Sequence, residues 1–475
     1  MANLPVIIQG GMGVGVSSWR LARAVSSLGQ LGVVSGTALD QVLARRLQDG
    51  DPGGHMRRGL EAFPVPDMAE RVWDAHYIAG GKPERTPYVK LPMPSLDAPR
   101  HLTELCVVAN FVEVHLARQG HGHPVGINYL EKLQPPHLPS LYGAMLAGVE
   151  YVLMGAGIPM KIPGALDALA RHEPASYPLP VTGAEAGAAH LLRLVPRDLV
   201  PCDLPDLRRP MFLPIVASAT LATTLLRKAN GRVDGFVVEG YTAGGHNAPP
   251  RGKLQLSADG EPIYGERDQV DPDAFREMGV PFWRAGGYGT REGLRDALAQ
   301  GATGVQVGTA FALCAESGLR DDFKRAIRAN AARLEVRVVT DARASPTGFP
   351  FKVVQLEGTM SEAAEYAARP RICDLGYLRE AYVTPEGTVG YRCASEPVST
   401  FVAKGGKVED TVGRKCICNA LMATVGHPQI RAGRHLEPGV VTSGDALVHL
   451  VDASASNGRP HTAAEVIRSL LDESI

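Results

Sequence analysis

The feature that constrains this chain most is a short apolar run followed by a glycine-rich loop, within residues 235–253. Residues 236–238 are aromatic or β-branched and show no polar alternation, which is typical of a strand buried on both faces. In parallel barrels, active sites are built directly after such strands. Gly244 and Gly245 allow a ligand to approach the backbone closely. His246 follows them and is the only residue of the loop with a side chain that titrates near neutral pH.

A second glycine loop follows in residues 281–309, which read as strand, glycine pair, helix and strand. The pair is Gly286 and Gly287, and the last strand ends at Gly308 and Thr309. Glycine pairs of this kind expose unpaired backbone N–H groups that bind phosphate. Two such loops after the last two strands form the usual phosphate site of a parallel barrel. The pattern therefore predicts a phosphate-bearing cofactor beside the histidine.

The rest of the chain alternates between strand-like and helix-like segments as far as about residue 335. The predicted strands are residues 4–9, 32–36, 124–130, 151–157, 211–218, 235–239, 281–286 and 304–308. Eight strands joined by helical crossovers predict an α/β fold, a (β/α)8 TIM barrel over residues 1–335. Residues 38–120 are expected to be a mostly helical insertion after the second strand. Residues 336–475 lack the alternation and are expected to pack on the barrel and border the site.

The glycines after the first strand invite a different interpretation, a dinucleotide-binding fold. Their spacing is G-x-G-x-G, however, and lacks the third glycine of that fingerprint. The next strand ends in Ser35 and Gly36, with no acidic residue to hold a ribose. We therefore reject the dinucleotide fold and assign this loop to the barrel.

Composition excludes several classes of protein. The chain has 475 residues, 45% of them hydrophobic, and a formal net charge of −1, which argues against a nucleic-acid partner. No apolar run reaches the length of about 18 residues needed to span a membrane. The first residues carry no basic segment of the kind that begins a secretory signal. Seven cysteines, an odd number, fit a reducing compartment. We expect a cytoplasmic protein.

Two charged residues near strand ends have alternative interpretations. Glu239 ends a buried strand, where an unpaired charge is costly, so we expect it to be paired with Arg284 or a lysine. Lys161 follows the fourth strand and either meets an anionic group in the site or is solvated.

The C-terminal cysteines also leave alternatives. Cys373, Cys393, Cys416 and Cys418 are spaced so that their thiolates can hold a structural zinc, but the paired Cys-x2-Cys knuckles of common zinc sites are missing. Buried thiols or a redox pair are therefore favoured, with no metal in the site.

Three motifs resemble those of one family. IIQGGMGVGVS, EGYTAGGH and AGGYGTREGLRDALAQGATGVQVGTAFALCAES, in this order, are similar to the signatures of the flavin-dependent nitronate monooxygenases. The related flavin enoyl-acyl carrier protein reductases share all three. The resemblance covers roughly residues 4–318, without the insertion.

The resemblance implies FMN at the C-terminal mouth of the barrel. It places Gly10, Gly11 and Met12 against the isoalloxazine ring and Asn128 at its polar edge. Gln306 would lie near the ribityl chain, and His246 would be the catalytic residue. The residues implied for the phosphate are Gly244, Gly245, Gly286, Gly287, Gly308 and Thr309.

The preferred function is oxidation of a small nitronate or similar carbon acid by O2. The alternatives are an NAD(P)H-dependent enoyl-thioester or quinone reductase and a non-catalytic barrel that binds a phosphorylated ligand. NAD(P)H as reductant and a homodimer are left open. In each interpretation the chain binds a small molecule.

Overall fold

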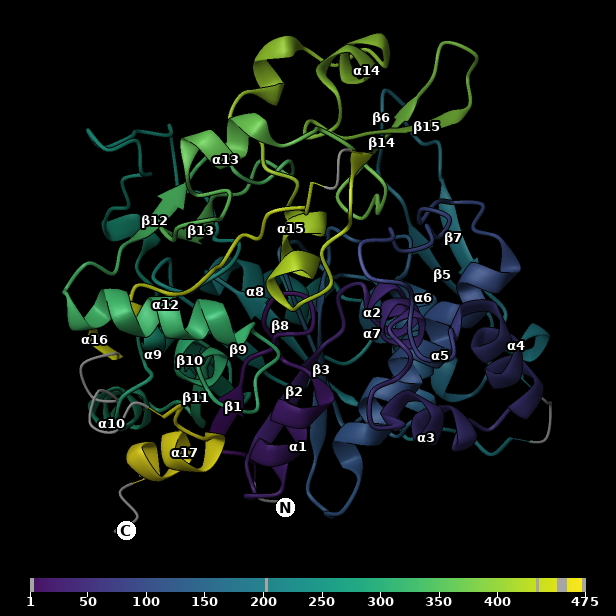
Figure 1. Cartoon of the computed structure of the whole chain (residues 1–475). Helices are drawn as coiled ribbons and strands as arrows, with labels where there is room; N and C mark the ends of the chain where they lie inside the picture. Colours follow the sequence, from purple (N-terminus) through teal and green to yellow (C-terminus); the bar gives the residue numbers. More distant parts are fainter. Residues whose placement is uncertain (1–3, 201–203, 433–434, 451–458, 472–475) are drawn as a thin grey trace.

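The structure, a computed structural model, describes residues 4–200, 204–432, 435–450 and 459–471. Its centre is a closed barrel of eight parallel strands in the order β1-β2-β3-β4-β8-β9-β10-β11, so the predicted TIM barrel is confirmed (Figure 1). The strands are β1 (Ile7–Gln9), β2 (Leu31–Ser35), β3 (Val125–Leu130), β4 (Tyr151–Gly155), β8 (Met211–Val216), β9 (Phe236–Glu239), β10 (Phe282–Ala285) and β11 (Gly304–Val307). Each overlaps a predicted segment: β2 begins one residue before its segment, and the other seven strands lie inside theirs.

Helices surround the barrel because one face of each helix is apolar. They are α1 (Trp19–Ser26), α6 (His137–Leu146), α7 (Ile162–Ala170), α8 (Ala219–Lys228), α9 (Pro272–Glu277), α10 (Arg291–Ala299), α11 (Thr309–Ala312) and α12 (Asp321–Ala332). Inside the barrel, a separate apolar cluster that includes Leu153, Val237 and Trp283 fills the interior. Trp283 Nε1 donates to Pro5 O at 2.7 Å, which satisfies the buried indole at the amino end of the barrel.

The expected insertion contains α2 (Leu39–Gln48), α3 (His55–Glu61), α4 (Pro66–His76) and α5 (Arg100–Arg118). The last helix differs from the others, because α5 packs between α1 and α6. This is the position of the crossover helix that leads from β2 to β3. The added segment is therefore confined to the residues before α5.

Antiparallel elements were not predicted between β4 and β8. β5 (Ala175–Pro178) pairs with β7 (Leu191–Leu194), while β6 (Val181–Thr182) pairs with a strand of the C-terminal region. β5 and β7 bury only every second residue and so lack the continuous buried run that marks barrel strands such as β1, and β6 is only two residues long.

The C-terminal region lies over one end of the barrel and then returns along its side (Figure 1). Its strands are β12 (Val338–Asp341), β13 (Phe351–Val354), β14 (Glu380–Val383) and β15 (Val389–Arg392), and its helices are α13 (Ala363–Ala368), α14 (Val398–Ala403), α15 (Ile417–Thr424), α16 (Leu447–Leu450) and α17 (Ala463–Leu471). α17 contacts α1, α10 and α11 of the barrel. The division of the chain into two domains remains a prediction.

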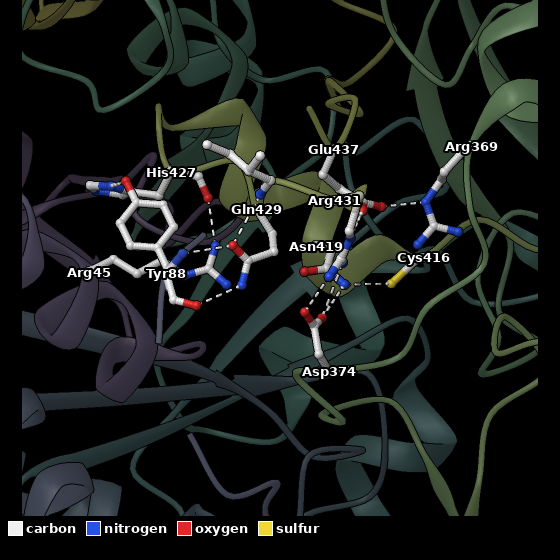
Figure 2. A network of polar contacts seen from close by, with 11 residues as sticks. Arg45, Tyr88, Arg369, Asp374, Cys416, Asn419, His427, Gln429, Arg431 and Glu437 are labelled. Atoms are coloured by element: carbon white, nitrogen blue, oxygen red, sulfur yellow. Dashed lines mark hydrogen bonds and ion pairs between the residues drawn. The ribbon is translucent and has the colours of Figure 1, made fainter. Parts of the chain in front are cut away.

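Polar contacts tie this region to the insertion (Figure 2). Tyr88 N–H donates to Gln429 Oε1 at 2.9 Å, and Gln429 Nε2 donates back to Tyr88 O at 3.1 Å. Arg45 of α2 donates to His427 O at 2.6 Å. No helix among the described residues is long and apolar enough to cross a membrane.

Candidate active site

The large cavity of the barrel, about 430 Å³, lies at the carboxyl ends of the strands. Every residue that the sequence predicted for the cofactor lines it, together with His246. These residues are Gly10, Gly11, Met12, Asn128, Gly244, Gly245, Gly286, Gly287, Gln306, Gly308 and Thr309. They meet because all follow or end parallel strands, whose carboxyl ends share one rim. Their individual roles remain predictions.

Unsatisfied polar atoms face the cavity from the barrel wall. Asn128 on β3 and Gln306 on β11 lie next to residues that point outward to the helices, so both side chains point inward. Asn128 Oδ1 and Gln306 Oε1 are buried and have no hydrogen-bond partner among the described residues. Buried acceptors of this kind are costly unless a ligand or water satisfies them. The wall is therefore suited to a ligand with N–H or O–H donors.

The glycines beside these side chains are required by space. A Cβ added at Gly11 would lie 2.4 Å from Asn128 Cβ, and one at Gly10 would lie 3.3 Å from Gln306 Cγ. A side chain at either position would fill the space against the polar wall. The backbone here is therefore left bare toward the cavity, as a flat ring packed against it would require.

His246 is held by residues of the C-terminal region. Its Nε2 lies 2.7 Å from Ser345 Oγ, which is in turn 2.8 Å from Thr347 Oγ1. The Phe351 ring meets the imidazole edge-on, with the ring centroids 4.8 Å apart. Burial lowers the pKa of His246 to about 4. The imidazole is therefore neutral at physiological pH, and one of its nitrogens is already engaged.

Glu239 does not form the predicted ion pair. Arg284 Nη2 donates instead to Tyr288 Oη at 2.7 Å, and no partner of the Glu239 carboxyl is found among the described residues. The reason is that side chains alternate between the two faces of a strand. Val237 and Trp283 face the barrel interior. Glu239, two residues after Val237, therefore points into the barrel, whereas Arg284, one residue after Trp283, points outward. Burial raises the pKa of Glu239 to about 8, so the group is mostly protonated at neutral pH.

The glycine loops meet a segment that the sequence did not connect with them. Gly245 N–H donates to Thr442 Oγ1 at 2.8 Å, and Gly444 N–H donates to Thr309 Oγ1 at 3.1 Å. Gly286 has a φ of +83°, and a Cβ there would lie 3.0 Å from Thr242 Oγ1. The loops are thus fixed in a conformation that only glycine adopts easily.

Several residues around the site were missed because they belong to the C-terminal region. Ser345 binds His246, and Tyr377, Cys418, Thr442 and Ser443 line the cavity. They are far from the barrel strands in sequence and follow no periodic pattern. The one local signal was the small, hydroxyl-rich run VTSG that ends at Gly444.

The remaining candidates lie outside the cavity or form no metal site. Lys161 is exposed and is not among the cavity residues, which favours the solvated alternative. The four C-terminal cysteines surround one small void of about 10 Å³. Burial raises the pKa of Cys373 to about 12 and that of Cys393 to about 11, so both are protonated thiols. In the described ranges no three His, Cys, Asp or Glu side chains are placed to hold a metal ion.

A closed parallel barrel with its main cavity at the carboxyl ends, walled by glycine loops and a neutral histidine, has the architecture of a TIM-barrel enzyme. A sequence model described as nitronate monooxygenase matches residues 208–386, the part that contains β8 to β11 and the first C-terminal strands. Over this part the chain is similar to the nitronate monooxygenase family.

Individual relatives share only part of their length with the chain. Nitronate monooxygenase of Paraburkholderia phytofirmans is 28% identical over 193 residues, which cover 37% of this chain and 46% of the relative. The Pseudomonas aeruginosa enzyme is 33% identical, over 29% of this chain and 38% of its own length. A Mycobacterium tuberculosis protein named (3aS,4S,5R,7aS)-5-hydroxy-7a-methyl-1-oxo-octahydro-1H-indene-4-carboxyl-CoA dehydrogenase is 31% identical, over 33% and 39%. The chain thus matches less than half of each.

Two solved structures align with most of the chain. FabK from Thermotoga maritima is 17% identical, with a TM-score of 0.48 over 98% of this chain and 92% of that chain. A nitroalkane oxidase from Streptomyces ansochromogenes is 16% identical, with a TM-score of 0.47 over 99% and 95%.

Proposed function

We propose that the chain is an FMN-dependent oxidoreductase that oxidises a small nitronate or similar carbon acid with O2. The observation that carries the proposal is the single cavity in which bare glycine backbone, the acceptors of Asn128 and Gln306, and His246 meet. A flavin carries a flat ring system with an N–H donor and a phosphate. The unsatisfied acceptors and the bare glycine wall fit such a group.

Each part of the flavin has residues suited to hold it. In this proposal Gly10, Gly11 and Met12 lie against the ring, Asn128 binds its polar edge, and Gln306 lies near the ribityl chain. The glycine loops and Thr309 hold the phosphate. FMN, when bound, supplies the two-electron redox chemistry, and the protein supplies binding and orientation.

The protonation state of His246 favours a substrate that is already ionised. A histidine with a pKa of about 4 is a weak base and is poorly suited to remove a proton from a neutral nitroalkane. A nitronate needs no such step and requires only a hydrogen-bond donor. The proposal requires the tautomer in which Ser345 Oγ–H donates to Nε2, because the imidazole proton is then on Nδ1 and can be donated to a nitronate oxygen. His246 thus binds and orients the substrate.

A second function, reduction of an enoyl thioester or quinone by NAD(P)H, is favoured by one feature of the cavity. One side of the cavity is apolar, formed by residues that include Leu133, Leu378 and Leu421. Such a wall suits a substrate with a hydrocarbon chain. A relative named as a CoA dehydrogenase is consistent with this alternative.

An anaerobic absorbance titration separates the two. The purified protein, saturated with FMN, is mixed in one sample with propyl nitronate and in another with NADPH. We expect loss of the oxidised flavin bands with the nitronate and not with NADPH. Bleaching by NADPH alone would establish the reductase, and failure to bind FMN would refute both.

A variant tests the role of the histidine in the same assay. We expect His246→Ala to bind FMN normally and to be bleached by nitronate about a hundredfold more slowly, the range in which removal of one oriented hydrogen-bond donor falls. Full turnover by this variant at saturating FMN would show that His246 does not orient the substrate.

A further inference from the structure

The segment from Thr442 to Gly444 lies directly on the glycine loop after β9. Besides the bond from Gly245 N–H to Thr442 Oγ1, Asp445 N–H donates to Thr242 O at 3.0 Å. On the other side, Gly444 N–H and Ser443 Oγ both bond to Thr309 Oγ1, at 3.1 and 3.3 Å. The segment therefore bridges the loop after β9 and the end of β11, which lie on either side of the β10 loop.

The close approach depends on a glycine on each side. A Cβ at Gly244 would lie 2.7 Å from the backbone carbon of Ser443, and a Cβ at Gly444 would lie 2.9 Å from Thr242 O. Both positions are in contact with backbone, which cannot move aside as a flexible side chain does. Any side chain at either glycine would push the segment off the loop.

The bridge brings hydroxyl groups together at the wall of the cavity. Thr309, Thr442 and Ser443 all line it, and Ser443 is only 8% exposed. Thr442 Oγ1 and Thr309 Oγ1 each accept a backbone N–H, so each hydroxyl still has its own proton to donate. An anion next to them would therefore meet donors.

The acidic residue that follows these donors in the chain, Asp445, is directed away from them. Asp445 does not line the cavity, and its Oδ1 lies 2.7 Å from Lys352 Nζ, which neutralises its charge. Lys352 is itself buried, with its Nζ also 2.7 Å from Thr340 Oγ1. Two other acids line the cavity. Burial raises the pKa of Glu239 to about 8, and the Asp268 carboxylate accepts from Arg251 N–H and Gly265 N–H. The hydroxyl cluster thus presents donors of the kind that a phosphate monoester requires.

We propose that Thr442 and Ser443 belong to the phosphate site of the flavin. Thr442 supplies a hydroxyl donor beside Thr309 and the glycine loops, and Ser443, whose hydroxyl donates to Thr309 Oγ1, leaves the Thr309 proton directed to the phosphate. The C-terminal region then contributes one side of the cofactor site. The inference rests on the proposed function, because the phosphate is that of FMN.

The test compares two flavins that differ only in the phosphate. FMN and riboflavin are titrated separately into the flavin-free full-length protein, and flavin fluorescence gives each Kd. We expect Thr442→Val to raise the Kd for FMN about tenfold, the loss of one hydrogen bond to a charged group. Ser443→Ala, which removes the donor that orients the Thr309 hydroxyl, should raise it by a smaller factor. The Kd for riboflavin should stay within about twofold of the wild-type value.

Thr442→Ser is the matched control, because it keeps the hydroxyl that accepts from Gly245 N–H, and we expect it to bind FMN as the wild type does. Circular dichroism confirms that each variant is folded. Unchanged FMN affinity in both hydroxyl-free variants would overturn the inference, as would an equal loss for FMN and riboflavin. If the wild type binds neither flavin, the proposed function itself fails.

Discussion

At the residue scale, Glu239 is unusual because it is an acid in the barrel mouth without a partner among the described residues. Its carboxyl points to the same side as Val237, one of the apolar residues that fill the interior. Burial alone raises its pKa, from an ordinary value of 4.5 to about 8. The folded protein therefore keeps a proton on Glu239 at pH values at which the unfolded chain has lost it.

This difference predicts how stability depends on pH. Between pH 4.5 and about 8 the folded state binds more protons than the unfolded state, so the free energy of unfolding falls as pH rises. The stability associated with the raised pKa of Glu239 is fully present below pH 4.5 and is lost as pH rises through about 8. Over this range the free energy of unfolding falls by on the order of 5 kcal/mol. Glu239→Gln should abolish this decline. Urea unfolding at pH 5, 7 and 9 measures it.

The control for this prediction is Glu386→Gln, which changes an exposed acid in the C-terminal region. It should keep the wild-type dependence on pH. If Glu239→Gln and the wild type lost stability in parallel between pH 5 and 9, Glu239 would be ionised normally in the folded protein.

At the scale of elements, the sequence predicted the barrel because its strands carry a local signal. Residues 236–238 are an apolar run, and residues 304–307 contain two valines; a glycine follows each segment within two residues. The order of strands in a parallel barrel follows the order in the chain. The residues that the resemblance implies for the cofactor line one cavity for the same reason, since strand ends share one rim, while their roles stay predictions. Ser345 and Thr442 could not, because only tertiary packing brings them to His246 and Gly245.

The predicted pairing of Glu239 with Arg284 was wrong because of how the two strands are paired. On the paired strands β9 and β10, Glu239 lies opposite Ala285, the residue that follows Arg284, so the backbones of Glu239 and Arg284 are close. Alternation along each strand nevertheless directs the two side chains to opposite faces of the sheet. Proximity along paired strands predicts contact only between residues on the same face.

The contact between α5 and α6 gives a prediction about helix packing. A Cβ at Gly143 in α6 would lie 2.0 Å from Val107 O in α5, so the helices touch backbone to backbone. Gly143→Ala must separate them and should lower the free energy of unfolding by roughly 1–3 kcal/mol, the usual cost of overpacking a core. This occurs although alanine favours helix more than glycine does.

Urea denaturation of Gly143→Ala and Gly122→Ala checks this. Gly122 has ordinary backbone dihedrals and open space where a Cβ would stand, so its replacement should have little effect. A Gly143→Ala protein as stable as the wild type would mean that the helices yield at no cost.

At the scale of the whole molecule, a buried ionic network holds the C-terminal region together (Figure 2). Glu437 is fully buried and binds both Arg369 and Arg431. Arg431 also pairs with Asp374 at 2.5 Å, and Asp374 accepts from Asn419 of α15 at 2.8 Å. The network thus joins residues more than 60 positions apart, such as Arg369 and Glu437. Glu437 is five residues before Thr442, where the segment on the glycine loop begins.

Glu437→Gln should therefore destabilise the protein strongly. The amide keeps the shape of the side chain but removes the charge that compensates two guanidinium groups, of which only 3% and 4% is exposed. Breaking a buried pair in this way costs about 3–5 kcal/mol, because Arg369 then stays buried without its counter-charge, whereas Arg431 keeps Asp374. Glu173→Gln removes one partner of the surface pair with Arg171, in which both side chains are about half exposed, and should leave the unfolding midpoint unchanged. Equal midpoints for the two variants in urea would show that water reaches the Glu437 network and that it contributes no net stability.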